Sequence, residues 1–170
     1  MIRQADETDL SEILAIYNDA ILNTTAVYTY AIQTLEDRTL WFYKKNEDKF
    51  PVLVYEENNT VIGFATFGPF RAWPAYKYTI EHSVYVHTQY RRNGIGTALI
   101  KEIIKIADER KFMTLVAGID AFNENSLKMH EKLGFEYSGT IKKAGFKFGK
   151  WLDLTFYQKN LSGPENPTDD

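Results

Sequence analysis

The chain of 170 residues contains no cysteine. Without a thiol it can form no disulfide, no thiolate metal site and no covalent acyl-cysteine intermediate, and this composition fits a reducing compartment. It contains only three histidines, none paired at the spacing of metal ligands, so we expect no metal site. No apolar run is long enough to cross a bilayer, and the N-terminus does not resemble a signal peptide. The sequence therefore predicts a cytoplasmic protein without a membrane partner.

The composition that remains is typical of a single globular domain. Hydrophobic residues make up 44% of the chain and aromatic residues 15%, which is enough for one sizeable core. The formal net charge of −3 gives the protein no general affinity for nucleic acid. We expect the domain to cover residues 2–161. The acidic segment 162–170, rich in Pro and Gly, is expected to be a disordered tail.

Apolar periodicity divides the chain into strands and helices. Strands at 51–55 and 61–67 indicate a hairpin, whereas later strands at 80–86 and 113–118 are separated by a helix. A hairpin pairs strands antiparallel and a strand–helix–strand crossover pairs them parallel, so we expect an α/β (α+β) domain with a mixed sheet. The other expected elements are a strand at 2–5, a helix capped by Asp6 whose apolar face carries Leu10 to Ile21, and a helix capped by Thr34 that contains Leu40, Trp41 and Tyr43. A further helix is expected at 124–133, followed by closing strands at 135–137 and 149–158.

A glycine turn joins the strand at 80–86 to the helix that follows it. Arg91, Gly94 and Gly96 form the pattern Arg-x-x-Gly-x-Gly. Glycines let the backbone approach a ligand closely, and the first turn of a helix offers unpaired N–H groups and the positive end of its dipole. The turn predicts an anion site with phosphate as its occupant, although the pattern is neither a P-loop nor a dinucleotide fingerprint. An ordinary strand-to-helix connection is the simpler alternative.

This turn, between the strand Val84-Tyr85-Val86 and an amphipathic helix, resembles the pyrophosphate-binding motif of the GNAT superfamily of acetyl-CoA-dependent N-acetyltransferases. The segment from Asn123 to Phe135 resembles the part of those enzymes that lies along the pantetheine arm of CoA. Other segments resemble the phosphinothricin N-acetyltransferase group, which includes methionine sulfoximine and methionine sulfone acetyltransferases. These segments are Tyr17 to Ile21, Asn23 to Ala26, Phe67 to Arg71, Ile80 to Val86, Met129 to Phe135 and Phe146 to Leu154, within a similarity that runs from residue 3 to 161.

The resemblance implies a single GNAT-type domain, with a mixed and mostly antiparallel sheet flanked by helices, and acetyl-CoA as co-substrate. The strand at Val84 and Val86 would offer backbone groups to pantetheine, the turn would hold the pyrophosphate, and Asn123 would hydrogen-bond the pantetheine arm. No metal is required. The expected cofactor-binding residues are Val84, Tyr85, Val86, Arg91, Arg92, Asn93, Gly94, Ile95, Gly96, Thr97, Asn123 and Ser126.

Glu81 is the candidate general base. A carboxylate in an otherwise apolar strand is costly to bury, which favours a functional role. A base must also remove a proton from an ammonium group before the nitrogen can attack a thioester. His82 is the competing candidate, and because side chains alternate along a strand, only one of the two should face a given cleft. By the resemblance, Glu81 would be the base, acting through water, and His130 the general acid on the thiol side; a packing histidine is the simpler interpretation of His130.

The acceptor pocket is expected around Arg71, whose planar guanidinium would bind a substrate carboxylate by the resemblance. A solvated loop charge is the simpler interpretation. Thr25 and Tyr28 would form the opposite wall, in a segment that otherwise reads as a connecting loop. The group is typically homodimeric, and the aromatic-rich segment 146–151 is a candidate for the interface. The expected substrate-binding residues are Arg71, Ala72, Trp73, Glu81, His82, Ser83, Thr25 and Tyr28.

The predicted function is direct acetyl transfer from acetyl-CoA to the α-amino group of a small amino acid-like substrate, such as phosphinothricin, methionine sulfoximine or methionine sulfone. One alternative is another amine acceptor, either a protein N-terminus or a polyamine. A carboxylate partner for Arg71 favours the amino acid. The second alternative is a non-catalytic acyl-CoA-binding sensor, which would need neither Glu81 nor His130.

Overall fold

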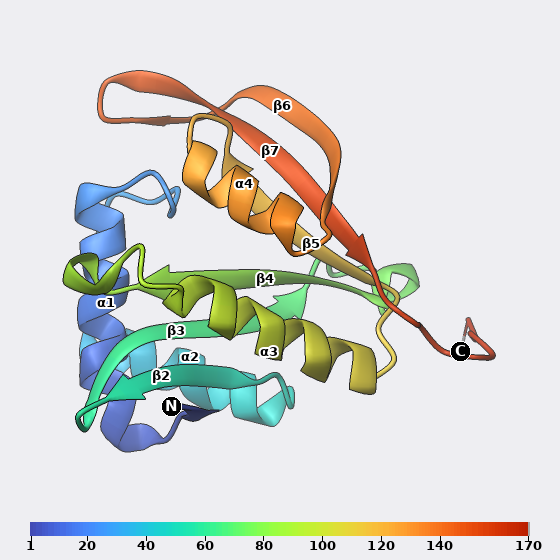
Figure 1. Ribbon diagram of the computed structural model, residues 1–170, viewed down its shortest axis with the longest axis horizontal. Helices are drawn as coiled ribbons and strands as arrows, with labels where there is room; N and C mark the ends of the chain where they lie inside the picture. Colours follow the sequence, from blue (N-terminus) through green and yellow to red (C-terminus); the bar gives the residue numbers. More distant parts are fainter. Residues whose placement is uncertain (170) are drawn as a thin grey trace. The chain divides into compact units, whose positions relative to one another are not determined.

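The computed structural model describes residues 1–169, and its elements form two compact units (Figure 1). The first unit contains Met1–Phe67 and Ser83–Ile100, and the second contains Gly68–His82 and the described chain from Lys101 onward. Strand β4 (Thr79–Val86) crosses the boundary, which falls between its fourth and fifth residues. Its first half therefore belongs to the second unit and its second half to the first.

The first unit is built on antiparallel pairing of β1 with β2 and of β2 with β3. On one face, Val54 of β2 and Phe64 of β3 pack in a core with Ile13 and Phe42 of two helices. Gly63, which points to the other face, lies against the start of a third helix. The elements are β1 (Ile2–Gln4), η1 (Glu7–Asp9), α1 (Leu10–Asn23), α2 (Leu35–Glu47), β2 (Val52–Glu57), β3 (Thr60–Pro69), η3 (Thr88–Tyr90) and the start of α3 (Ile95–Glu109).

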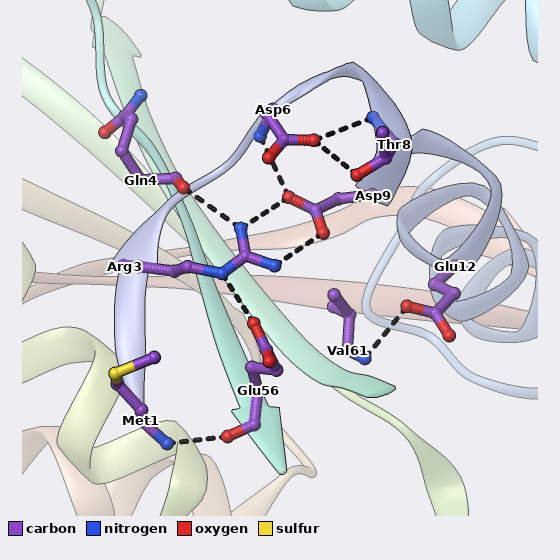
Figure 2. A network of polar contacts seen from close by, with 9 residues as sticks. All are labelled: Met1, Arg3, Gln4, Asp6, Thr8, Asp9, Glu12, Glu56 and Val61. Carbon is purple, nitrogen blue, oxygen red and sulfur yellow. Dashed lines mark hydrogen bonds and ion pairs between the residues drawn. The ribbon is translucent and has the colours of Figure 1, made fainter. Parts of the chain in front are cut away.

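A network of hydrogen bonds and ion pairs links β1 to η1 and β2 in the first unit (Figure 2). The guanidinium of Arg3 pairs with Asp9 at 2.7 Å and with Glu56 at 2.6 Å. The Asp9 carboxylate also accepts the backbone N–H of Asp6 at 2.9 Å. Asp9 is buried, with 3% of its surface exposed. Arg3 therefore balances a carboxylate that would otherwise be buried without a cation.

Replacing Arg3 by Met is expected to destabilise the protein. The change removes two N–H donors from the buried Asp9 carboxylate, and we expect a loss of about 2 kcal/mol in the free energy of unfolding. Urea denaturation of the two proteins measures this difference. The control is Lys44→Met, which breaks exposed pairs with Glu47 and Asp48 and should have a smaller effect. Equal losses in both variants would contradict the proposed role of Arg3.

In the second unit, the first half of β4 pairs parallel with β5. Strand β7 pairs antiparallel with both β5 and β6. Helix α4 lies across this part of the sheet (Figure 1), where the hydroxyl of Tyr157 donates to Glu131 at 2.9 Å. Its N-cap is Asn123, whose side chain accepts the backbone N–H of Ser126. The elements are η2 (Pro74–Tyr76), β4, the end of α3, β5 (Thr114–Asp120), α4 (Glu124–Lys132), β6 (Glu136–Lys147) and β7 (Lys150–Asn160).

Strand order across the sheet is β1-β2-β3-β4-β5-β7-β6. The only parallel pair whose register is described joins β4 to β5, so the expected mixed and mostly antiparallel sheet flanked by helices is confirmed. The closing strands differ from the sequence-based expectation in one respect. Instead of a short strand at 135–137, β6 is 12 residues long, because two register shifts let it continue past Gly139 and Gly145.

The segment after β7 makes contacts within the second unit. The backbone N–H of Ser162 donates to Asp108 at 2.8 Å, and that of Thr168 donates to the hydroxyl of Tyr78 at 3.1 Å. Gly163 is buried against Met113. The expected domain limit at 161 and the expected disorder of 162–170 stay predictions, and Asp170 lies outside the described residues.

Candidate functional site

Glu81 and His82 lie on opposite faces of β4, as strand alternation requires. Glu81 is in register with Val116 of β5, and a methyl group added at Gly118 would lie 2.9 Å from the Glu81 carboxylate. Gly118 itself is exposed, so this carboxylate lies on the face of the sheet that α4 does not cover. His82 is buried and contacts His130 of α4. The structure therefore brings Glu81 and Gly118 together and places His82 apart from them.

The surroundings of Glu81 suit a general base. Partial burial raises the pKa of its carboxyl above the usual value, and the positive charge of Arg71 opposes that increase. A raised pKa makes a carboxylate a stronger base. Glu81 is half-buried, so the group stays open to a substrate.

Arg71 belongs to the loop between β3 and β4. Its guanidinium lies 4.2 Å from the centre of the Phe70 ring and donates to the Phe70 carbonyl at 2.9 Å. Ala72 and Trp73 follow it and are exposed, Trp73 with 75% of its surface accessible. The cation is thus supported by an aromatic face while its other N–H groups can reach a ligand. This arrangement is compatible with the predicted clamp for a carboxylate.

His82 and His130 form a buried pair. Their rings are stacked at 5.2 Å, and their Nε2 atoms are 3.2 Å apart. Nδ1 of His130 is 2.7 Å from the carbonyl of Ser126, which can only accept, so Nδ1 carries the proton. His82 then donates through Nε2 to the bare Nε2 of His130. Nδ1 of His82 is left buried without a hydrogen-bond partner among the described residues.

Both imidazoles of this pair are neutral at neutral pH. Burial lowers the pKa of each, and the charge of His130 lowers that of His82 further. In the unfolded chain, His82 and His130 take up protons near the usual pKa of histidine. In the folded chain, this buried pair does so only at lower pH. Stability is therefore fully present above that value and is lost as pH falls towards the lower pKa of the folded state.

Replacing His82 by Met is expected to weaken the pH dependence of stability. Each imidazole kept neutral in the fold steepens the loss by about 1.4 kcal/mol per pH unit below the usual histidine pKa. Denaturant titrations at pH 7, 6 and 5 should therefore give a shallower slope in His82→Met than in the wild type. The matched control is His87→Gln, because His87 is the N-cap residue of η3 and lies outside the pair. An unchanged slope in His82→Met would show that the pair does not couple folding to pH.

The glycine turn lies in the first unit. Arg92 and Gly94 have positive φ values of 67° and 79°, which turn the backbone into α3 at Ile95. The N–H of Ala98 bonds to the Gly94 carbonyl, so the first-turn amides before it have no intrahelical acceptor. Arg91 donates to the carbonyl of Val86 at 3.1 Å and pairs with Asp19 at 3.2 Å. Free amides, a helix dipole and exposed arginines together fit a phosphate group.

The remaining expected residues are also located in the first unit. Ser83, Val84 and Val86 are half-buried along β4, and Tyr85 packs its ring against Tyr17 and Phe64. The expected wall residues follow the end of α1: Thr25 is half-buried and Tyr28 is exposed. The part of Thr25 and Tyr28 in substrate binding stays a prediction.

The comparisons with known proteins decide the family. The family profile described as "Acetyltransferase (GNAT) domain" matches residues 2–156. The chain belongs to the GNAT acetyltransferase family. The GNAT fold expected from the glycine turn is thus confirmed, and so is the assignment of the chain as an acetyltransferase.

Curated GNAT relatives include enzymes for small amino acid-like compounds. The chain is 40% identical over 160 residues to the L-methionine sulfoximine/L-methionine sulfone acetyltransferase of Salmonella typhimurium, covering 94% of each chain. It is 33% identical to the phosphinothricin N-acetyltransferase of Streptomyces viridochromogenes, covering 98% of this chain and 90% of the relative. Among solved structures, yncA from Salmonella typhimurium with its cofactor acetyl-CoA has a TM-score of 0.96 and 39% identity, covering 99% of this chain and 97% of that one.

Sequence reasoning missed two features of this GNAT chain. One is the close approach of Gly118 to Glu81, which the expected strand at 113–118 does not predict, although a glycine inside a strand often marks such an approach. The second is a cavity beside Phe70 in the second unit, lined by residues from four strands and a loop. Within residues 1–169 we find no cluster of His, Asp and Glu suited to a metal ion. None of the helices formed by these residues has the length and apolar character needed to cross a bilayer.

Proposed function

We propose that this chain transfers the acetyl group of acetyl-CoA directly to the α-amino group of a small amino acid-like substrate. The observation that carries the proposal is the half-buried Glu81 carboxylate, with its raised pKa, on the face of β4 that α4 leaves open. The same strand continues into the glycine turn that fits a phosphate. Names of the relatives support the acceptor class, namely methionine sulfoximine, methionine sulfone and phosphinothricin.

The proposed reaction needs one base and one electrophile. Acetyl-CoA, when bound, supplies the electrophilic thioester carbonyl. Glu81 takes a proton from the acceptor ammonium, directly or through one water, which frees the nitrogen lone pair. As the C–N bond forms and the C–S bond breaks, the nitrogen loses its second proton and the leaving thiolate takes up one proton. The products are the N-acetylated acceptor and the CoA thiol, and Glu81 returns its proton to solvent. Arg71 binds the acceptor carboxylate and so orients the amine, and residues 91–97 hold the pyrophosphate through backbone amides.

His130 has a more restricted part in this proposal. Its two ring nitrogens contact the Ser126 carbonyl and Nε2 of His82. Protonation of the thiolate by His130 would require Nε2 to exchange His82 for the thiolate and to acquire a proton. The proposal therefore depends on Glu81 as the base and treats proton delivery by His130 as a separate hypothesis, tested by comparing His130→Phe with the wild type in burst-phase kinetics.

We also propose that two copies of the chain associate through the β6–β7 hairpin. Apolar side chains of this hairpin each expose between 46% and 62% of their surface: Tyr137, Ile141, Phe146, Phe148 and Trp151. The rings of Phe146 and Trp151 pack edge to face, with their centres 5.2 Å apart. Apolar surface of this kind favours association. Sedimentation equilibrium tests the proposal, and a monomer at micromolar concentration would contradict it.

The experiment that tests the function is thiol release from acetyl-CoA by the purified protein. The chain has no cysteine, so it adds no background to a thiol reagent. Methionine sulfone, methionine sulfoximine, phosphinothricin, a peptide with a free N-terminus and a polyamine are compared in parallel. Turnover of any of the first three supports the proposal. Turnover of the peptide or polyamine alone would overturn the acceptor class, and tight CoA binding without turnover would favour a sensor.

A further inference from the structure

A cavity of about 500 Å³ lies in the second unit, on the same face of the sheet as Glu81. Its floor includes Thr79, Val116 and Phe156, which alternation and register place on the Glu81 face of β4, β5 and β7. Strand β6 contributes Gly139, which lies at one of its register shifts, and the loop before β4 contributes Phe70. The volume is within the usual range for small-molecule sites.

The cavity begins beside the reacting groups. Phe70 lines it, and the guanidinium of Arg71 lies 4.2 Å from the centre of that ring. On the other side, a methyl group at Gly118 would lie 2.9 Å from the Glu81 carboxylate and 3.6 Å from the ring of Phe156, which also lines the cavity. One aromatic wall therefore adjoins the predicted carboxylate clamp, and the other adjoins the predicted base.

The chemistry of the lining is mixed but uncharged. The rings of Phe70 and Phe156 pack edge to face at 6.3 Å and make the apolar part. Ser138 and Gln158 supply the polar part, where the Ser138 hydroxyl donates to the Gln158 side-chain oxygen at 2.9 Å. Among the described residues that line the cavity, none carries a charged side chain. Ser138 is exposed, so the cavity is open to solvent on this side. A charged group that exchanges water for this lining finds no counter-charge among the lining residues, whereas a neutral polar group can share these hydrogen bonds.

We propose that this cavity receives the side chain of the acceptor amino acid and selects an uncharged side chain with an apolar stem and a hydrogen-bonding end. The inference rests on the proposed function and deepens it, because it states which acceptors the same site prefers. With the amine at Glu81 and the carboxylate at Arg71, the side chain is the part of the acceptor left to enter the cavity. An anionic side chain enters without a counter-charge and is selected against.

The test measures kcat/KM with three acceptors: L-methionine sulfone, whose side chain is neutral, phosphinothricin, whose side chain is anionic, and L-alanine, whose side chain is too short to fill the cavity. In the wild type, we expect the sulfone to exceed each of the others by about 100-fold. Val116→Phe, which fills the floor, should reduce the ratio of sulfone to alanine by about 10-fold or more. Gln158→Lys, which adds a cation, should reduce the ratio of sulfone to phosphinothricin.

Controls separate the possible failures. Glu109→Gln, at the exposed end of α3, changes the net charge as Gln158→Lys does and should leave both ratios as in the wild type. Thermal unfolding shows whether each variant is folded, and the two cavity variants test the proposal independently. Wild-type ratios in both folded variants would overturn the cavity assignment while the acetyltransferase function stands. A wild type that acetylates none of the three acceptors would instead overturn the proposed function.

Discussion

Glu81→Gln is expected to lower kcat/KM by about 10²–10⁴-fold, because the amide cannot accept a proton from the acceptor ammonium. Gln has nearly the shape of Glu, so the variant should fold and bind acetyl-CoA as the wild type does. The measurement is steady-state thiol release across pH, with CoA affinity determined by calorimetry. Glu57→Gln, at the exposed end of β2, is the matched control for loss of a carboxylate.

The pH profile adds a second criterion for Glu81. The base works only when ionised, so wild-type kcat/KM should fall as pH falls through the Glu81 pKa. Burial raises that pKa and Arg71 opposes the increase, so the acid limb should lie above the usual value for glutamate. The limb should disappear in Glu81→Gln. Near-normal kcat/KM in this variant, with an unchanged acid limb, would remove Glu81 from the mechanism.

Gly118→Ala is expected to lower kcat by about 10–100-fold without destabilising the fold. The added methyl would lie 2.9 Å from the Glu81 carboxylate oxygen, which is too close. A carboxylate at the end of a flexible side chain can move away at little cost to folding. The same movement takes the base out of position for proton transfer, so the effect should appear in kcat and not in the melting temperature.

Gly63→Ala provides the contrast for Gly118→Ala. Its methyl would lie 3.2 Å from the backbone oxygen of Tyr85 and 3.1 Å from Ile95, neither of which can swing away. This variant should therefore lower the melting temperature, as crowding in a packed interior does. If Gly118→Ala instead lowers the melting temperature and keeps its kcat, the glycine serves packing and the carboxylate lies elsewhere during catalysis.

Local patterns in the sequence predicted the elements that local chemistry determines. The glycine turn before α3, the Asn123 cap of α4 and the alternation of Glu81 and His82 all depend on residues close together in the chain. Each follows from backbone geometry or strand periodicity, so a single sequence is enough to predict it. The family resemblance then added the sheet as a whole.

Features that depend on strand register were missed. Gly118 faces Glu81 only because β5 pairs parallel with β4 at one particular register, and sequence spacing does not specify that register. Gly139, which lines the cavity, lies at a register shift of β6, and the partner of His130 proved to be a histidine 48 residues away. Long-range pairing of this kind is set by packing of the whole sheet.

Acid should inactivate the protein in two separable stages, because Glu81 and His82 lie on opposite faces of β4 and respond differently to protonation. Glu81, on the open face, gains a proton without disturbing the packing around it, so activity lost in this way should return at once when the buffer is restored. His82, one residue later, is held between β4 and α4, and its protonation requires the buried pair to open. Activity lost by that route should return only as fast as the chain refolds. Brief and prolonged acid exposure should therefore leave different fractions of enzyme recoverable.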